Sequence, residues 1–122
     1  MESPGYRHIA VAWEKDAAIV QFRYIRRHEY GDYEAIQTEL ESVAGEARTL
    51  LLNMDAWEHI SSRFVGILLS LAKRCSAEGR SFAVCRLQTE PLRILRLCKA
   101  DTLISIYPSE EEARRALGIG GE

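Results

Sequence analysis

The sequence predicts an α/β protein with a single mixed, mainly parallel sheet, an N-terminal β-hairpin and about four helices. Three observations support this fold class. The run 49–54 (TLLLNM) is almost unbroken in its hydrophobicity, which is typical of a strand buried on both faces of a helix-covered sheet. From Phe64 to Cys75, apolar residues recur with the period of an amphipathic helix. Strand-like and helix-like segments then alternate to the end, in the order β-β-α-β-α-β-α-β-α, which favours parallel strand pairs.

The N-terminal segment predicts the hairpin. Residues 7–13 alternate in polarity, as in a half-buried strand, and residues 18–24 form the expected partner beyond a polar turn at 14–16. Residues 25–31 show no clean period and predict a connecting loop. Asp32 is then a good N-cap for a first helix that ends near Gly45.

The central strand at 49–54 leads through a polar loop into the second helix. Ser61 and Ser62 lie where this helix must begin, and Ser62 is interpreted as the N-cap of a helix starting at Arg63. Gly79 is the expected residue of its C-terminal cap. Because Leu51 and Leu68 lie in the most continuous apolar segments, they are predicted to face each other across the strand–helix layer.

The C-terminal part predicts a core strand at 80–87, a third helix, a short strand at 102–107 and a fourth helix. The third helix begins at Glu90–Pro91, where a missing N–H is tolerated. Ser109 is the predicted N-cap of the fourth helix, with acidic residues in its first turn. The residues expected to face inward on these two helices are Leu92, Leu95, Cys98, Ala113, Ala116 and Leu117.

Length and composition indicate one globular domain, at residues 6–117, with flexible termini at 1–5 and 118–122. The chain has 122 residues, of which 47% are hydrophobic and 28% charged. No apolar run approaches the roughly 20 residues of a membrane span, and the N-terminus lacks a secretory signal pattern. A cytoplasmic protein without membrane insertion is expected. The three cysteines, Cys75, Cys85 and Cys98, are expected to be buried and inert.

Charge is distributed unevenly along the chain. Residues 29–58 contain eight acids and one base, whereas residues 63–101 contain eight bases and three acids. Such a division suggests a dipolar surface that orients a protein partner, although solvated helix faces that differ in sign are the simpler explanation. The bases are too scattered for a nucleic-acid-binding protein.

No pattern supports catalysis, a metal or a cofactor. Asp55, His59 and Ser62 contain the residue types of a catalytic triad, but all three lie on one short loop and no G-x-S-x-G elbow is present. The three histidines are dispersed without ligand spacing. Nucleotide-binding glycine motifs are absent. The chain is therefore expected not to be an enzyme, with no catalytic residue and no metal.

The segment 50–71 resembles the centre of the STAS family, the sulfate transporter and anti-sigma factor antagonist domains. In that family a buried strand leads into an Asp-Ser-Ser/Thr-Gly-Leu-Gly motif and then a leucine-rich helix. Ser62 aligns with the serine that regulated members phosphorylate, and Gly66 with the second glycine. Ser61, Arg63 and Phe64 replace the aspartate, the second hydroxyl residue and the first glycine. Phe64 either packs inward, as its place in the apolar stripe favours, or forms part of an interface.

The resemblance implies a regulatory, non-enzymatic domain that binds a kinase-like anti-sigma factor or another regulatory protein. Ser62 is the phosphorylation candidate and Ser61 an alternative. The expected partner surface is the loop 55–62 with the exposed face of the following helix, comprising Asp55, Trp57, His59, Arg63, Gly66, Ser70, Lys73 and Arg74.

Two other hypotheses remain open at this point. In one, the replaced motif residues mark a scaffold subunit that has lost phosphorylation, binds constitutively and forms a homo-oligomer. In the other, the chain is an accessory subunit of a membrane lipid or solute transporter, as some family members are.

Overall fold

The computed structural model describes residues 6–23 and 33–120, and within them one five-stranded sheet forms the centre of the molecule. The strands follow one another across the sheet in the order β1-β2-β3-β4-β5. The first pair is antiparallel and the other three pairs are parallel. The predicted mixed sheet with an N-terminal hairpin is therefore confirmed. The strands are β1 (Ile9–Glu14), β2 (Ala17–Phe22), β3 (Thr49–Asn53), β4 (Ser81–Cys85) and β5 (Ser105–Tyr107).

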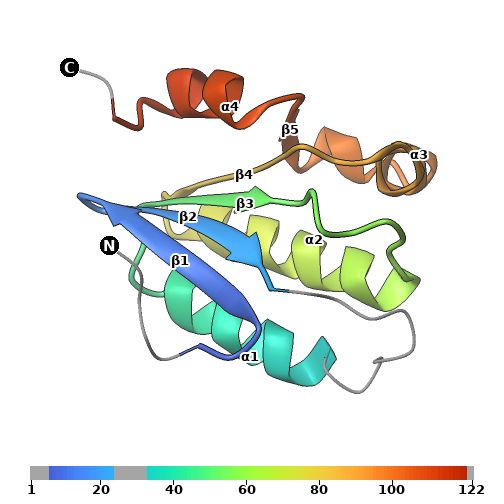
Figure 1. The fold of residues 1–122 in the computed structure, drawn as a ribbon, viewed down its shortest axis with the longest axis horizontal. Coiled ribbons are helices and arrows are strands. Elements are labelled where there is room, and N and C mark those ends of the chain that lie inside the picture. The colour runs from blue at the N-terminus through green and yellow to red at the C-terminus, as the bar shows by residue number, and fades with distance from the viewer. Residues whose placement is uncertain (1–5, 24–32, 121–122) are drawn as a thin grey trace.

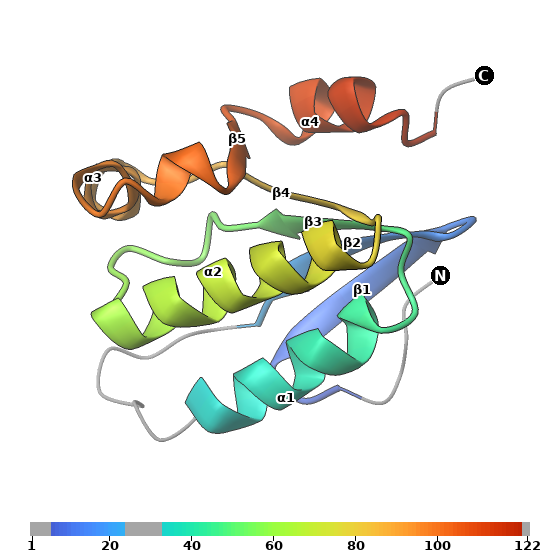
Figure 2. The same cartoon turned by 180° about the vertical axis from the view of Figure 1, so that it is seen from behind.

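Helices cover both faces of this sheet. Figures 1 and 2 show α1 and α2 side by side on one face and α4 on the other, with α3 at the end toward which β2 and β3 point. The helices are α1 (Tyr33–Ala44), α2 (Ser62–Ala77), α3 (Thr89–Leu97) and α4 (Glu110–Leu117), and a 3₁₀ turn, η2 (Ala100–Thr102), follows α3. No helix within the described part of the chain is long and apolar enough to cross a membrane.

Alternation along β3 divides its leucines between two cores. Leu50 and Leu52 belong to the larger core beneath α1 and α2, which also contains Leu68. Leu51 belongs to the smaller core on the α4 face, with Ala113 and Ile119. The prediction that Leu51 and Leu68 face each other is therefore wrong. Successive side chains of a strand point to opposite faces, and a continuous apolar run does not reveal which face each one takes.

Several boundaries differ from the prediction for local reasons. Helix α3 ends at Leu97 and Lys99 has a positive φ of 59°, so Cys98 lies beyond the helix and is exposed instead of buried. On α4, Ala113 is buried but Ala116 is exposed. Ile119, placed by the prediction in a flexible terminus, is only 7% exposed. The predictions for Tyr24, the loop 25–31, the Asp32 cap and the termini 1–5 and 121–122 concern residues outside those that the structure describes.

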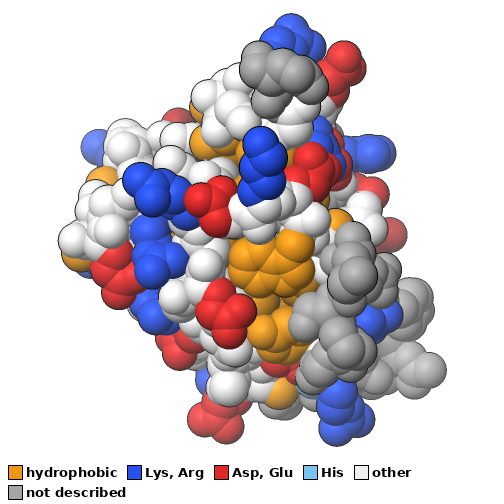
Figure 3. Space-filling model, turned by 90° about the vertical axis from the view of Figure 1, so that its left-hand side faces the viewer, with side chains coloured by type: hydrophobic (Ala, Val, Ile, Leu, Met, Phe, Trp, Pro, Cys, Tyr) orange, Lys and Arg blue, Asp and Glu red, His pale blue; other side chains and the backbone are white. Residues whose placement is uncertain are grey.

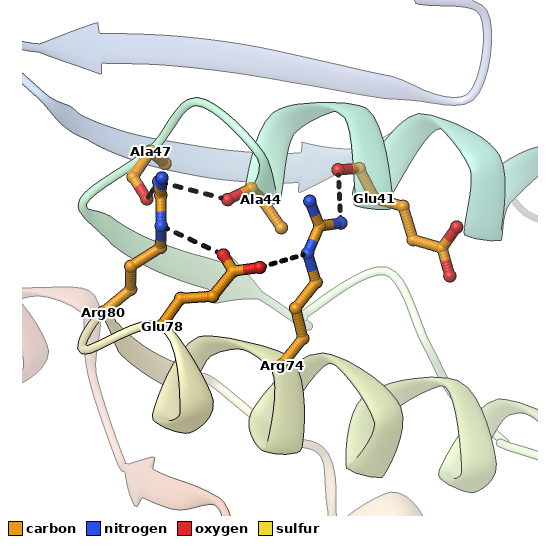
Figure 4. A network of polar contacts seen from close by, with 6 residues as sticks. All are labelled: Glu41, Ala44, Ala47, Arg74, Glu78 and Arg80. Carbon is orange, nitrogen blue, oxygen red and sulfur yellow. Dashed lines mark hydrogen bonds and ion pairs between the residues drawn. The ribbon is translucent and has the colours of Figure 1, made fainter.

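Two arginines fasten the C-terminal end of α1 (Figure 4). Arg80 donates from Nη1 to the carbonyl oxygens of Ala47, at 2.6 Å, and Ala44, at 3.4 Å. Arg74, on α2, donates to the carbonyl oxygen of Glu41 at 3.0 Å. Glu78 accepts a hydrogen bond from Arg74 Nε at 3.4 Å and forms an ion pair with Arg80, whose Nε lies 3.2 Å from its carboxylate. The last carbonyls of a helix have no partner within it, and Arg80 supplies one to Ala44 at the negative end of the helix dipole. Arg74 adds a second donor to the Glu41 carbonyl, which also accepts from the N–H of Gly45.

At the edge of the sheet, Glu39 joins α1 to the segment that leads into β1. Its carboxylate accepts hydrogen bonds from the backbone N–H groups of Arg7 and His8, both at 3.0 Å, and lies 3.1 Å from the His8 ring nitrogen Nδ1. Partial burial acts to raise the pKa of Glu39, but the bonds from His8 and Arg7 outweigh it and hold the pKa below its ordinary value of 4.5.

Candidate functional site

The loop from β3 ends at Ser61, and this serine caps α2. Ser61 has extended backbone, with φ −93° and ψ 166°, and its Oγ accepts a hydrogen bond from the backbone N–H of Phe64 at 3.2 Å. The helix begins at Ser62. The prediction that Ser62 is the cap is therefore wrong by one residue. Both serines precede the same helical run, and only the backbone geometry distinguishes them.

Because Ser61 performs the capping, Ser62 is exposed in the first turn of α2. The first N–H groups of a helix have no partner within it and form the positive end of its dipole. Arg63, the next residue, is also exposed. An anionic group carried by Ser62 would thus lie beside unsatisfied donors and a cationic side chain.

An aromatic cluster holds the loop beneath this helix start. The indole of Trp57 stacks on the ring of Phe64, with centroids 4.1 Å apart and planes at 25°. Phe22 and Tyr33 contact both rings. Trp57 is only 2% exposed and Phe64 is fully buried. From the sequence, Trp57 could be either an exposed partner contact, as which it was included in the expected partner surface, or the apolar anchor of the loop. Its burial in the core identifies it as the anchor and removes it from the partner surface. Phe64 packs inward, as the apolar stripe favoured.

The indole Nε1 of Trp57 is buried and has no hydrogen-bond partner in the described structure. Such groups are rare in native proteins, because an unpaired buried donor costs free energy. The indole is therefore held by its aromatic contacts and not by a hydrogen bond from Nε1. The contacts of Phe22 and Tyr33 with this ring could not be predicted, since the two residues belong to a strand and a helix that are distant from the loop in the sequence.

The outer side of α2 presents a row of exposed residues at helical spacing. Ser62, Gly66, Ser70 and Lys73 are all exposed, as the sequence predicted. A Cβ added to Gly66 would meet no atom within 4 Å, so nothing within the described fold requires glycine there. In a helix interior, glycine costs roughly 0.5–1 kcal/mol relative to alanine. Gly66 therefore lowers the stability of α2 at an exposed position where no packing contact requires a glycine.

Arg74 does not belong to this free surface. Its guanidinium is bound to the carbonyl of Glu41 and to Glu78. The side chain is 39% exposed, but its donors hold two helices together. Arg74 therefore helps to pack α2 against α1, and its predicted contact with a partner remains a prediction.

Asp55 lies at the carboxyl end of β3, next to the corresponding end of β4. Its carbonyl oxygen accepts a hydrogen bond from Gln88 Nε2 at 2.8 Å, and its carboxylate lies 4.0 Å from Arg86. Asp55 and Arg86 are both exposed. Gln88 and Arg86 were absent from the predicted site. The rule that carboxyl ends of neighbouring parallel strands meet at one edge of a sheet would have indicated them.

His59 and Glu58 are exposed in the same loop. No group of three or more His, Cys, Asp or Glu side chains in the described ranges 6–23 and 33–120 could hold a metal ion. The polar residues of the loop are thus arranged on a surface, with an exposed hydroxyl at a helix start as their most distinctive member.

Among protein families, the sequence model described as the STAS domain matches residues 13–113 of this chain. No curated protein matches the sequence significantly. The solved structures with a similar fold include an anti-sigma-factor antagonist (STAS) domain protein from Planctomyces limnophilus. It has a TM-score of 0.80 and 20% identity over 90% of this chain and 97% of that one.

Two further structures show the same fold. An anti-sigma factor antagonist from Mycobacterium paratuberculosis has a TM-score of 0.79 and 18% identity, covering 97% of this chain and 99% of that one. The Bacillus cell fate determinant SpoIIAA, in its phosphorylated form, has a TM-score of 0.66 and 12% identity, covering 88% and 98%. Identities at this level report the fold alone. Since the family model spans most of the sequence, this chain belongs to the STAS domain family.

Proposed function

We propose that this chain is a non-enzymatic, cytoplasmic regulatory module of the anti-sigma factor antagonist type. Its working surface is the start and outer side of α2, and its partner is a kinase-like anti-sigma factor that phosphorylates Ser62. The observation that supports this proposal most strongly is that the two serines occupy different positions at the start of α2. Ser61 caps the helix, which leaves the Ser62 hydroxyl exposed at the positive end of the dipole.

The replaced motif residues have structural roles that are compatible with this function. Ser61 stands where the family motif has aspartate, and both residue types are strong N-caps. Phe64 stands where the motif has glycine, and its ring is buried against Trp57. Neither replacement removes the exposed hydroxyl or covers the outer side of the helix.

Gly66 supports a partner at the same surface. A bare backbone at this position lets another chain approach α2 closely, and the fold itself has no need of it. Phosphate on Ser62 would add about −1.5 to −2 charges one turn away. The added charge would lie close to a partner bound at Gly66 and would change the affinity of that partner, so that phosphorylation would control binding.

The experiment begins with affinity capture of the partner from the native host, followed by binding measurements on variants. Ser62→Asp should weaken binding about tenfold or more, while Ser62→Ala should bind like the wild type, because only the first adds charge. Gly66→Arg should also weaken binding by filling the approach. Ser76→Asp is the matched control, since Ser76 is exposed at the other end of α2.

The outcomes separate the competing functions. Phosphate detected on Ser62 by intact-mass spectrometry after incubation with the captured kinase, together with the Asp/Ala contrast, supports the switch. Equal binding by Ser62→Asp and wild type, without phosphate, would leave a constitutive scaffold. Capture of a transporter ATPase or permease instead of a sigma regulator would favour the transporter subunit.

A further inference from the structure

Two leucines near α3 are exposed to an extent unusual for their size. Leu97, the last residue of α3, is 66% exposed and Leu103, just after η2, is 60% exposed. They are the exposed large hydrophobic residues of the described structure. Scattered single leucines on a surface are ordinary, but two within one short segment require a closer look.

The backbone that presents these leucines is anchored on both sides. Leu95 is fully buried, and Ala100 and Ile104 are 1% and 2% exposed in the larger core. The N–H groups of Leu103 and Ile104 both donate to the carbonyl of Ala100 at 2.9 Å. The leucines are therefore held outward by a packed segment and do not belong to a fraying end.

Exposed cationic residues lie close to the leucines in the chain. Arg93, Arg96 and Leu97 stand at i, i+3 and i+4 of α3 and share its outer side. Arg93 is paired with Glu90 at 2.7 Å. For Arg96 and Lys99, the described structure contains no ion pair. At the opposite end of the molecule, side chains of both signs are intermixed around a hydrophobic area (Figure 3).

We propose that Arg96, Leu97, Lys99 and Leu103, here called the α3 patch, dock an acidic, leucine-bearing segment of a protein partner. The exposed leucines need apolar counterparts, and the two uncompensated cations need carboxylates. An amphipathic helix with glutamates beside its apolar side supplies both. The proposal does not rest on the switch at Ser62.

Two other occupants fit the patch less well. An anionic membrane surface is attracted by clusters of 4–8 Lys or Arg. The α3 patch has two unpaired cations, and the exposed Asp101 lies between Lys99 and Leu103 in the chain. A second copy could offer the acidic side of α1, with Glu34 and Glu41, but that helix has no exposed large hydrophobic residue to meet the leucines.

The test uses a synthetic helical peptide of about 16 residues, long enough for a helix to persist. It carries leucines at i, i+3, i+4 and i+7 with glutamates on both flanks, and binding is measured by fluorescence anisotropy. Leu97→Ser and Leu103→Ser should each weaken binding about tenfold, equivalent to about 1.4 kcal/mol. Arg96→Glu should do the same. Arg48→Glu, an exposed position preceding β3 at the other end of the sheet, is the matched charge control and should bind like the wild type.

A second readout comes from Cys98, which is exposed between Leu97 and Lys99. The other two cysteines are buried, and burial raises the pKa of Cys85 to about 11, so a maleimide should modify Cys98 selectively in the folded protein. Bound peptide should slow that modification several-fold. This footprint places the peptide on the α3 patch, and circular dichroism verifies that each variant is folded.

Every other result overturns the proposal. Absence of binding refutes it directly. If a peptide with lysines in place of the glutamates binds as tightly as the acidic peptide, Arg96 and Lys99 do not recognise carboxylates. Capture by phosphatidylglycerol vesicles without peptide binding assigns the patch to a membrane surface. Self-association that Leu97→Ser abolishes, again without peptide binding, assigns it to a second copy.

Discussion

At Ser61 and Ser62, two chemically identical side chains serve different purposes because the backbone turns between them. Ser61 is extended and its Oγ accepts the N–H of Phe64 in the first turn, while Ser62 is already helical and exposed. A hydroxyl used as a cap is occupied, whereas one that follows the cap is available for chemistry. Under the proposed function, this difference would let Ser62 be modified without loss of the helix cap.

The division predicts a contrast in stability. Ser61→Ala should lower the free energy of unfolding by about 1 kcal/mol, within the range of 0.5–2 kcal/mol known for N-caps. Ser62→Ala, an exposed change without a lost partner, should stay within about 0.5 kcal/mol of the wild type. Urea unfolding measures both. Ser61→Asp, which can still cap, should restore most of the loss, and equal losses at both serines would contradict the assignment of the cap.

Single residues were predictable where they belonged to a periodic pattern. Phe64 shares the helical stripe of Ile67 and Leu68, and its burial followed from that spacing. Trp57 lies in a loop without a period, so its contact with Phe64 could not be foreseen. Cys98 was misplaced because the stripe on α3 was extended past the true end of the helix.

At the scale of elements, β3 shows what an apolar run conceals. Buried parallel strands are hydrophobic on both faces, so the sequence predicts the strand but not the direction of each side chain. Pairing with β2 and β4 fixes the direction, because Leu51 lies beside Ile19 and Ala83 on the α4 face. The carbonyls bound by Arg74 and Arg80 were equally hidden, since they lie 33 to 36 residues away.

The two cores predict how leucine substitutions combine. Leu51→Ala and Leu68→Ala should each cost about 2–5 kcal/mol, because both side chains are fully buried. Since they lie on opposite faces of the sheet, the double variant should equal the sum within about 0.5 kcal/mol. Denaturant unfolding of the four proteins measures this cycle. A coupling free energy well above that margin would mean that the two leucines share one core.

At the scale of the whole molecule, the order of elements and the mixed sheet were predictable, because each depends on local periodicity and on general rules of strand connection. The two proposed contact surfaces were harder to predict. The exposed residues on the outer side of α2 could be predicted because they are the helix positions that lie outside its apolar stripe. The α3 patch was missed, since an exposed leucine has the same sequence signal as a buried one.

The whole fold should also respond to acid through Glu39. The pKa of this carboxyl is below 4.5 in the folded protein because His8 and Arg7 donate hydrogen bonds to it, with burial opposing them. Between the folded pKa and 4.5, the unfolded chain binds more protons, so stability falls as pH falls. The contribution is fully present above 4.5 and is lost through the folded pKa.

Glu39→Gln should therefore be less stable than the wild type near neutral pH, by about 1.5–3 kcal/mol as expected for hydrogen bonds to a charged group. The difference should shrink as both proteins are titrated below the ordinary pKa of 4.5. Glu41→Gln removes a carboxylate from the exposed side of the same helix and serves as the control with little effect at either pH. Urea midpoints across this range measure the difference. A gap that persists undiminished in acid would show that Glu39 acts through its shape and not through its charge.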